Sequence, residues 1–238
     1  MKRILKMIYN DSSETYYKKI SRYMDLNEKR FIITANPETL MTYEKNEDYK
    51  KIFDNPCIDV IPDGIGVIYA GRLCKVRMKE RITGYDTMIN ILTLANQKKK
   101  SIYLYGAEKH VLNKVKEKIK KDYPKIKVVG AENGFDKNPD VVFKDIINKK
   151  PDVCIVALGI PKQELLINKY IDKFKKGIFI GVGGSFDVFS GTKKRAPKAF
   201  IKLRLEWLYR IIKEPKRLKR FYSNNIKFIV HILKIRKK

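Results

Sequence analysis

The fold is decided by the stretch Ile58-Asp59-Val60-Ile61-Pro62-Asp63-Gly64-Ile65-Gly66-Val67. Its first half is an apolar run that predicts a buried strand. The residue before a proline is pushed out of the α region, so the strand ends near Ile61. Asp63 then stands where the next helix begins, and two interpretations are open. The local pattern favours an N-cap that accepts a backbone N–H. The alternative is a carboxylate at the carboxyl edge of a parallel sheet, where open α/β folds bind ligands.

The same alternation of apolar strand and amphipathic helix runs through most of the chain. Strands are predicted at residues 3–8, 31–34, 58–61, 101–105, 126–129, 153–158 and 177–182. Helices are predicted at residues 13–27, 37–53, 64–72, 108–121, 139–149 and 162–174, with one more that Thr83 or Asp86 caps and that runs to about Gln97. This order predicts an α/β fold with a Rossmann-like, mostly parallel sheet and helices on both faces.

In such a fold the turns that lead from strand to helix share one edge of the sheet, because the crossovers are right-handed. Polar and small residues gather at this predicted edge. They are Thr34, Asn36, Asp63, Gly106, Gly159, Gln163, Gly183 and Ser185.

The pattern changes after Gly191. Helical periodicity runs from about residue 197 to 213, breaks at Pro215 and resumes to the end without a strand. We therefore expect an α/β catalytic core at residues 1–191 and a basic, amphipathic helical appendage at residues 192–238. Such an appendage suits an interfacial helix on anionic lipid.

The charge of the chain is extreme and unevenly placed. The net charge is +27, and residues 192–238 hold 17 lysines and arginines against two glutamates, a net +15, which leaves +12 for the other residues. A basic segment of this kind attracts an anionic surface, either nucleic acid or anionic lipid. Charge alone does not choose between the two.

Composition narrows the functional classes further. The first residues do not form a signal peptide, and no apolar run reaches the roughly 18 residues of a membrane span. Three cysteines without a CxxC pair and two distant histidines give no zinc-like spacing, and they indicate reduced thiols in the cytosol. The sequence also contains no Walker A motif, no GxSxG elbow and no two aspartates two residues apart.

Several candidate residues have an ordinary interpretation when taken singly. The turn Gly181-Val182-Gly183-Gly184-Ser185 resembles half of a dinucleotide fingerprint; it either binds a phosphate with its N–H groups or is a tight turn that needs small residues. Taken alone, Arg81 is interpreted as a surface charge and Gln163 as a polar residue on a helix face. Asn36 is interpreted as a cap. Three arginines, Arg210, Arg217 and Arg220, read as members of a solvated basic face.

Together, however, these segments resemble a known family, because they stand in the order in which the WecG/TagA/CpsF glycosyltransferases carry them. The first four segments are Thr34-Ala35-Asn36-Pro37-Glu38, Pro62-Asp63-Gly64-Ile65-Gly66, Arg81-Ile82-Thr83-Gly84 and Gly159-Ile160-Pro161-Lys162-Gln163-Glu164. The later ones are Gly181-Val182-Gly183-Gly184-Ser185-Phe186-Asp187, Gly191-Thr192-Lys193-Lys194-Arg195-Ala196-Pro197, Leu205-Glu206-Trp207-Leu208-Tyr209-Arg210 and Glu214-Pro215-Lys216-Arg217. The resemblance covers about residues 5–220. Ile160 and Lys198-Ala199 depart from the usual pattern and carry no proposed catalytic group.

The resemblance implies an inverting, metal-independent transfer of an N-acetylhexosamine-type sugar from a UDP donor, with no cofactor. The acceptor it implies is GlcNAc linked to undecaprenyl diphosphate, at the cytoplasmic face of the bacterial cell membrane. The nearest branch adds N-acetylmannosamine to begin the wall teichoic acid linkage unit. No single residue fixes the donor sugar, which is a uronic acid or another hexose in other branches.

The resemblance also implies roles for the candidates. Asp63 is the base that removes a proton from the acceptor hydroxyl, although an aspartate with an ordinary pKa of about 4 is a weak base. Arg210, Arg217 and Arg220 supply positive charge for the departing UDP, together with the N–H groups of the turn at residues 183–185. The expected sugar and acceptor contacts are Thr34, Asn36, Arg81 and Gln163, whose side chains donate hydrogen bonds. Five residues of the edge turns are also expected to bind substrate, namely Gly106, Gly159, Gly183, Gly184 and Ser185.

Other classes compete with this interpretation. The basic charge is the argument for a nucleic-acid-binding protein. Against it, the aromatic residues of the tail recur at the helical spacing of a buried face, whereas nucleic-acid binding needs exposed ones. A nucleotide-dependent methyltransferase or reductase shares the predicted sheet, but no acidic residue follows an early glycine loop at the spacing of a ribose clamp. Apolar faces on the core helices also make a homodimer a possible assembly.

Overall fold

The structure is a computed structural model that describes residues 1–203, 205–215 and 217–236; at positions 210, 217, 219–224 and 236 it describes the backbone alone. Its strands are β1 (Lys29–Ala35), β2 (Ile58–Pro62), β3 (Ser101–Gly106), β4 (Lys127–Glu132), β5 (Val153–Ala157) and β6 (Gly177–Gly181). The helices of the first half are α1 (Lys2–Met7), α2 (Ser13–Asp25), α3 (Pro37–Lys45), α4 (Glu47–Ile52), α5 (Ile65–Leu73) and α6 (Gly84–Gln97). Those of the second half are α7 (Lys109–Asp122), α8 (Pro139–Lys149), α9 (Lys162–Ile171), α10 (Ser185–Phe189), α11 (Lys198–Lys202), α12 (Glu206–Lys213) and α13 (Arg217–Arg236).

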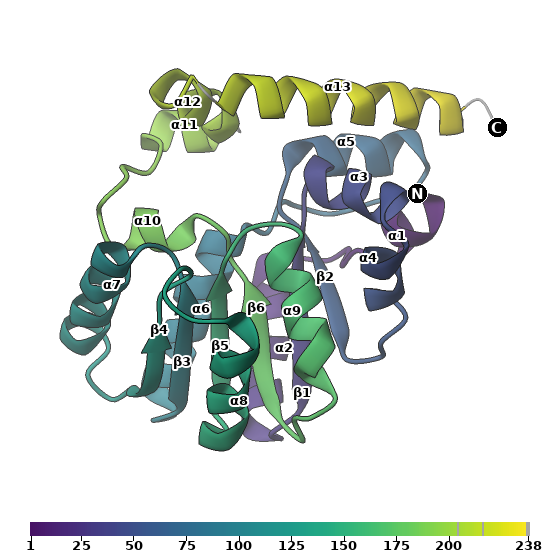
Figure 1. Cartoon of the computed structure of the whole chain (residues 1–238). Coiled ribbons are helices and arrows are strands. Elements are labelled where there is room, and N and C mark those ends of the chain that lie inside the picture. Colours follow the sequence, from purple (N-terminus) through teal and green to yellow (C-terminus); the bar gives the residue numbers. More distant parts are fainter. Residues whose placement is uncertain (204, 216, 237–238) are drawn as a thin grey trace.

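The six strands form one all-parallel sheet in the order β2-β1-β6-β5-β3-β4, with helices on both faces (Figure 1). Every residue of β5 and β6 is buried, as expected for central strands covered on both sides. Along β1 the side chains alternate between two cores: Phe31 and Ile33 belong to one, and Ile32 to the other. The predicted α/β fold with a parallel sheet is confirmed.

One predicted strand is wrong. The segment predicted as a strand at residues 3–8 forms α1, which buries Ile4 and Leu5 in the core, and Ile8 makes a single bridge to Val60. An apolar run this short fits a buried helix as well as a buried strand, so periodicity alone cannot separate them.

Two further boundaries differ from the sequence-based expectation. The helix predicted at residues 37–53 is two helices, because Asn46 is extended, ends α3 and accepts the N–H of Tyr49 as the N-cap of α4. The N-cap of α5 is Gly64, so the cap favoured by the local pattern at Asp63 is also wrong. Of the two caps left open for α6, the structure has Thr83, whose side chain accepts the N–H of Asp86.

The C-terminal helices α11, α12 and α13 run across the end of the sheet at which α5 and α10 begin (Figure 1). The longest of them, α13, packs on α3 and α5 and buries Phe228 and Ile232 in the same core as Phe31. The segment predicted as an appendage is therefore joined to the α/β core by apolar packing. Within the described residues, α13 included, no helix has the length and apolar content needed to cross a membrane.

Candidate functional site

The loop that carries Asp63 is fixed by backbone hydrogen bonds from its neighbours. The N–H groups of Asp63 and Gly64 both donate to the carbonyl of Ala35 at the end of β1, at 2.9 and 3.1 Å. The N–H of Ile82 donates to the carbonyl of Pro62 at 2.8 Å. A side chain at Gly64 would lie 2.9 Å from the ring of Pro37, so only glycine allows this approach. The backbone therefore holds Asp63 at the carboxyl edge of β2, where the sequence predicted it.

Thr34 lies beside Asp63 at the end of β1. A Cβ atom added to Gly84 would lie 2.9 Å from the methyl group of Thr34 and 3.8 Å from a carboxylate oxygen of Asp63, which places all three residues together. Asn36 follows on the same loop and caps α3, its side-chain oxygen accepting the N–H of Thr39 at 3.0 Å. The capping interpretation of Asn36 is confirmed. Its Cβ atom would lie 3.3 Å from a Cβ atom added to Gly64, next to Asp63, and a sugar contact stays a prediction.

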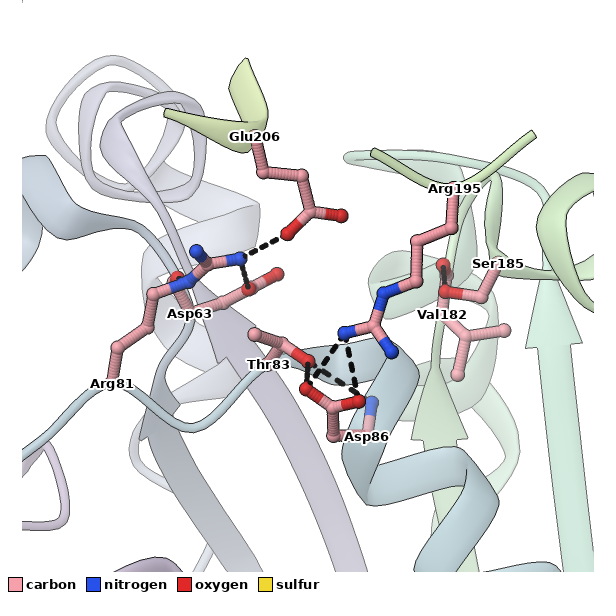
Figure 2. A network of polar contacts seen from close by, with 8 residues as sticks. All are labelled: Asp63, Arg81, Thr83, Asp86, Val182, Ser185, Arg195 and Glu206. Atoms are coloured by element: carbon pink, nitrogen blue, oxygen red, sulfur yellow. Dashed lines mark hydrogen bonds and ion pairs between the residues drawn. The ribbon is translucent and has the colours of Figure 1, made fainter. Parts of the chain in front are cut away.

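Arg81 lies between two carboxylates (Figure 2). Its Nε donates to the backbone carbonyl of Asp63 at 2.5 Å, and one terminal nitrogen donates to Glu206 of α12 at 2.7 Å. The same nitrogen is 3.8 Å from the carboxylate of Asp63. The Arg81 side chain is only 18% exposed, so it is not the plain surface charge that was the alternative interpretation.

Gln163 braces two loops of the sheet edge. Its side-chain oxygen accepts the N–H groups of Gly159 and Gly183, at 3.1 and 3.0 Å, and the residue is buried. A Cβ atom at Gly181 would lie 2.6 Å from the Gln163 amide nitrogen, which explains the glycine there. Gln163 is therefore a buried support and not a polar residue on an exposed helix face.

This brace also changes the expectation for the turn at residues 183–185. The N–H of Gly183 is taken by Gln163, and the N–H and hydroxyl of Ser185 both donate to the carbonyl of Val182, at 3.1 and 2.8 Å. Gly183 has a positive φ of 49°, which fits the tight-turn interpretation. Two of the three N–H groups in the turn thus have partners inside the chain, so its capacity to bind a phosphate is smaller than the sequence suggested.

Glu164 is a buried carboxyl group next to this brace, and no role was predicted for it from the sequence. One of its oxygens accepts the amide of Gln163 at 2.7 Å, and the other has no hydrogen-bond partner among the described residues. Burial raises the pKa of Glu164 from its ordinary value to about 7. A signal was present in the sequence: Glu164 precedes the apolar run Leu165-Leu166-Ile167 on a helix, a position that faces the core.

A second charged group fastens the segment that leads to the C-terminal helices. Arg195 contacts both carboxylate oxygens of Asp86, at 2.8 and 2.9 Å, and its guanidinium lies 4.4 Å from the ring centre of Tyr85. Asp86 also accepts the hydroxyl of Thr83 at 2.7 Å. Figure 2 shows Arg195 directed at the Asp86 carboxylate, with Thr83 hydrogen-bonded to the same group. The sequence placed Thr83 and Arg195 in motifs, but their shared partner became visible only in the structure.

Gly106 does not join Asp63. It ends β3, and β3 is separated from β2 by three strands, which corresponds to about 19 Å across the sheet. Its φ is 119°, and a Cβ atom would lie 2.4 Å from the carbonyl oxygen of Ala157. The close approach to β5 accounts for this glycine, so its predicted substrate contact would have to be far from Asp63. Gly159 also has a positive φ, 79°, and lies on the β5 loop held by Gln163.

The three predicted arginines of the tail lie on helices that reach this edge. The backbone of Arg210 belongs to α12, and those of Arg217 and Arg220 belong to α13. Their side chains lie outside the described part of the structure, so their role stays a prediction. Among residues 1–203, 205–215 and 217–236, no three His, Cys, Asp or Glu side chains gather as a metal site would require.

The fold and the site define an open, parallel α/β protein with a carboxylate and an arginine at the carboxyl edge of its sheet, the edge at which such folds bind ligands. The profile of the glycosyl transferase WecG/TagA/CpsF family matches residues 3–238. The chain therefore belongs to this family of glycosyltransferases, as its motifs indicated.

Individual relatives agree with the family profile. A Bacillus subtilis (strain 168) protein is 45% identical over 201 residues, which cover 84% of this chain and 78% of the relative. A Bacillus spizizenii protein is 41% identical over 212 residues, 89% of this chain and 82% of the relative. A Staphylococcus aureus (strain MW2) protein is 35% identical over 208 residues, 87% and 81% of the two chains. All three are named N-acetylglucosaminyldiphosphoundecaprenol N-acetyl-beta-D-mannosaminyltransferase.

Proposed function

We propose that this glycosyltransferase moves N-acetylmannosamine from a UDP donor to N-acetylglucosaminyldiphosphoundecaprenol, with inversion at the anomeric carbon and without a metal. The names of its relatives support this acceptor and this sugar, and the transfer would serve teichoic acid linkage synthesis. The observation that carries the proposal is Asp63, held by its backbone at the carboxyl edge with Arg81 beside it. The family match favours this function over the nucleic-acid-binding alternative.

In the proposed reaction, a hydroxyl of the acceptor sugar attacks the anomeric carbon of the donor. A new carbon–oxygen bond forms there while the bond to the UDP oxygen breaks, and Asp63 takes the proton of the hydroxyl. A modest base suffices where proton removal lags behind the departure of the leaving group. The three backbone hydrogen bonds around residues 62–64 keep the carboxylate oriented, which lowers the entropic cost of the attack.

The bond electrons leave with UDP, so positive charge or N–H groups must stabilise the diphosphate. Because the turn at residues 183–185 already uses two of its N–H groups within the chain, we assign most of this stabilisation to Arg210, Arg217 and Arg220. Their helices lie at the correct edge of the sheet. Thr34 and Asn36 are the proposed sugar contacts closest to Asp63.

We also propose that the C-terminal helices bind the membrane that holds the acceptor. Large apolar side chains are exposed on and beside these helices, whereas Phe228 and Ile232 of α13 are buried. The exposed ones are Leu203, Trp207, Ile212, Leu218, Ile226, Ile229, Val230 and Leu233. Apolar residues on a strongly basic helix match an anionic lipid surface. This supports peripheral binding at the inner face of the bacterial membrane; the division at residue 191 and a homodimer stay predictions.

One experiment tests the function. The full-length protein is incubated with a lipid-diphosphate-GlcNAc analogue and a panel of UDP-sugars in EDTA, and the products are weighed by mass spectrometry. We expect addition of one N-acetylmannosamine, loss of turnover in Asp63→Asn with UDP binding retained, and no change in Asp172→Asn, a matched control with an 83% exposed side chain. Preference for another UDP-sugar would correct the donor. A strict need for a divalent metal, or full turnover by Asp63→Asn, would refute the mechanism.

A further inference from the structure

Glu206 stands apart from its neighbours in the C-terminal segment. It is 4% exposed, whereas Trp207 next to it is 37% exposed and Leu203 is 68% exposed. A carboxylate taken out of water costs free energy unless a charged or hydrogen-bonding partner compensates it. Two compensations for Glu206 lie within the described residues: it is in the first turn of α12, where the helix dipole favours negative charge, and it accepts a hydrogen bond from Arg81 at 2.7 Å.

Arg81 connects Glu206 to the candidate base. The same guanidinium donates to the backbone carbonyl of Asp63 at 2.5 Å and lies 3.8 Å from the Asp63 carboxylate (Figure 2). The 2.7 Å contact with Glu206 is thus much the shorter of its two carboxylate contacts. If the Glu206 charge were removed, the guanidinium would have the Asp63 carboxylate within reach and would form a closer ion pair with it.

We propose, resting on the function proposed above, that Glu206 is a positioning residue for the transfer reaction and acts through Arg81. It fastens α12, and with it the arginine-bearing helices, to the loop of Asp63. It also draws the Arg81 guanidinium away from the Asp63 carboxylate, which leaves that carboxylate able to accept the proton of the attacking hydroxyl.

Whether Glu206 holds α12 in place can be measured by the fluorescence of Trp207. Trp207 is the single tryptophan of the chain and follows Glu206 directly, so its fluorescence reports on α12 alone. In the full-length protein we expect Glu206→Gln to raise acrylamide quenching of Trp207 by about twofold, because α12 opens more often. Glu206→Asp, which keeps the charge on a shorter side chain, should give an intermediate value. Glu14→Gln removes a 78% exposed carboxylate from α2 and should leave quenching at the wild-type value.

Whether Glu206 affects the transfer reaction is measured by steady-state kinetics of the same proteins. We expect Glu206→Gln to lower kcat by about tenfold or more with a smaller change in the KM for the donor, because misplacement affects the reacting geometry more than nucleotide binding. Glu206→Asp should recover part of kcat. A purely structural role would change the melting temperature without this separation of kcat from KM.

Quenching and kcat of the Glu206 variants are judged together. Increased quenching together with reduced kcat supports the proposal. Unchanged quenching, or increased quenching with unchanged kcat, overturns it, because Glu206 would then either not hold α12 or hold it without consequence. If the wild-type protein transfers no sugar, the proposed function fails, while the quenching values still decide whether Glu206 holds α12 in place.

Discussion

The sheet and the C-terminal helices are held in different ways. Every side chain of β5 and β6 is buried, and two apolar cores cover the two faces of the sheet. The C-terminal helices instead bury Phe228, Ile232 and Glu206 while much of their apolar surface stays exposed. Polar contacts with the core supplement this packing, namely Glu206–Arg81 at 2.7 Å and, in the segment that leads to α11, Arg195–Asp86 at 2.8 Å.

This difference gives the two regions different roles at the site: the sheet edge supports Asp63 rigidly, and the C-terminal helices can move. Hydrophobic burial makes the sheet edge a rigid support for Asp63, because many well-packed side chains must move before the backbone can. The C-terminal helices have fewer buried contacts, and regions of that kind open at lower free energy than a core. We expect perturbations of the helices to change transfer before they change the sheet.

The largest effect should come from removing residues 192–238. Transfer should fall by about a thousandfold or more, since Glu206 and the three tail arginines are lost and charge stabilisation of the leaving group goes with them. The sheet should remain folded, but less stable, because the surfaces of α3 and α5 under Phe228 and Ile232 become exposed. Product formation, circular dichroism and thermal unfolding measure the three effects. Turnover at the full-length rate would show that the helices play no part in the chemistry.

A smaller effect is expected from Phe228→Ala in the full-length chain. Truncating a buried phenylalanine costs about 4 kcal/mol, and here the loss should fall on the docking of α13. Hydrogen exchange should therefore accelerate in α13 while the amides of β5 remain protected. Leu233→Ala, at a 46% exposed position of the same helix, is the matched control and should change little. Equal acceleration in β5 and α13 would mean that the two regions open as one unit.

The smallest expected effect is a pH dependence of the folding stability, caused by Glu164 of α9. Because the pKa of Glu164 is raised to about 7 in the folded chain, the folded state holds this proton more tightly than the unfolded state, whose ordinary value is 4.5. Stability should therefore decrease as the pH rises between these values, and the full penalty, on the order of 3 kcal/mol, should apply above them.

Glu164→Gln tests this penalty, because the amide oxygen can still accept the hydrogen bond from Gln163. Urea unfolding at a series of pH values should show a variant that is more stable than the wild type at neutral pH and equal to it below the lower value. Glu117→Gln, at an exposed position of α7, should leave the wild-type profile intact. A wild-type profile without this decrease would show that Glu164 is not buried as a protonated acid.

Much of the fold and part of the site could be predicted from local sequence. The helix at residues 139–149 was placed correctly, because an asparagine cap and Pro139 mark its start and apolar residues recur on one face. Asp63 and Thr34 were assigned to one edge of the sheet and Arg81 to the substrate contacts, and the structure brings the three residues together. The strand predicted at residues 3–8 was wrong, because the burial of this short segment depends on neighbours that lie far along the chain.

By itself, the sequence determined the alternation of strands and helices, the carboxyl edge where the polar residues gather, the basic tail and, through its motifs, the family. Tertiary structure alone decided the strand order, which leaves Gly106 about 19 Å from Asp63 across the sheet. It also decided that Gln163 braces two loops and that Arg81 pairs with Glu206, 125 positions away. The reason is that periodicity and capping are local properties of the chain, whereas the partner of a buried charge is set by which distant segments pack together.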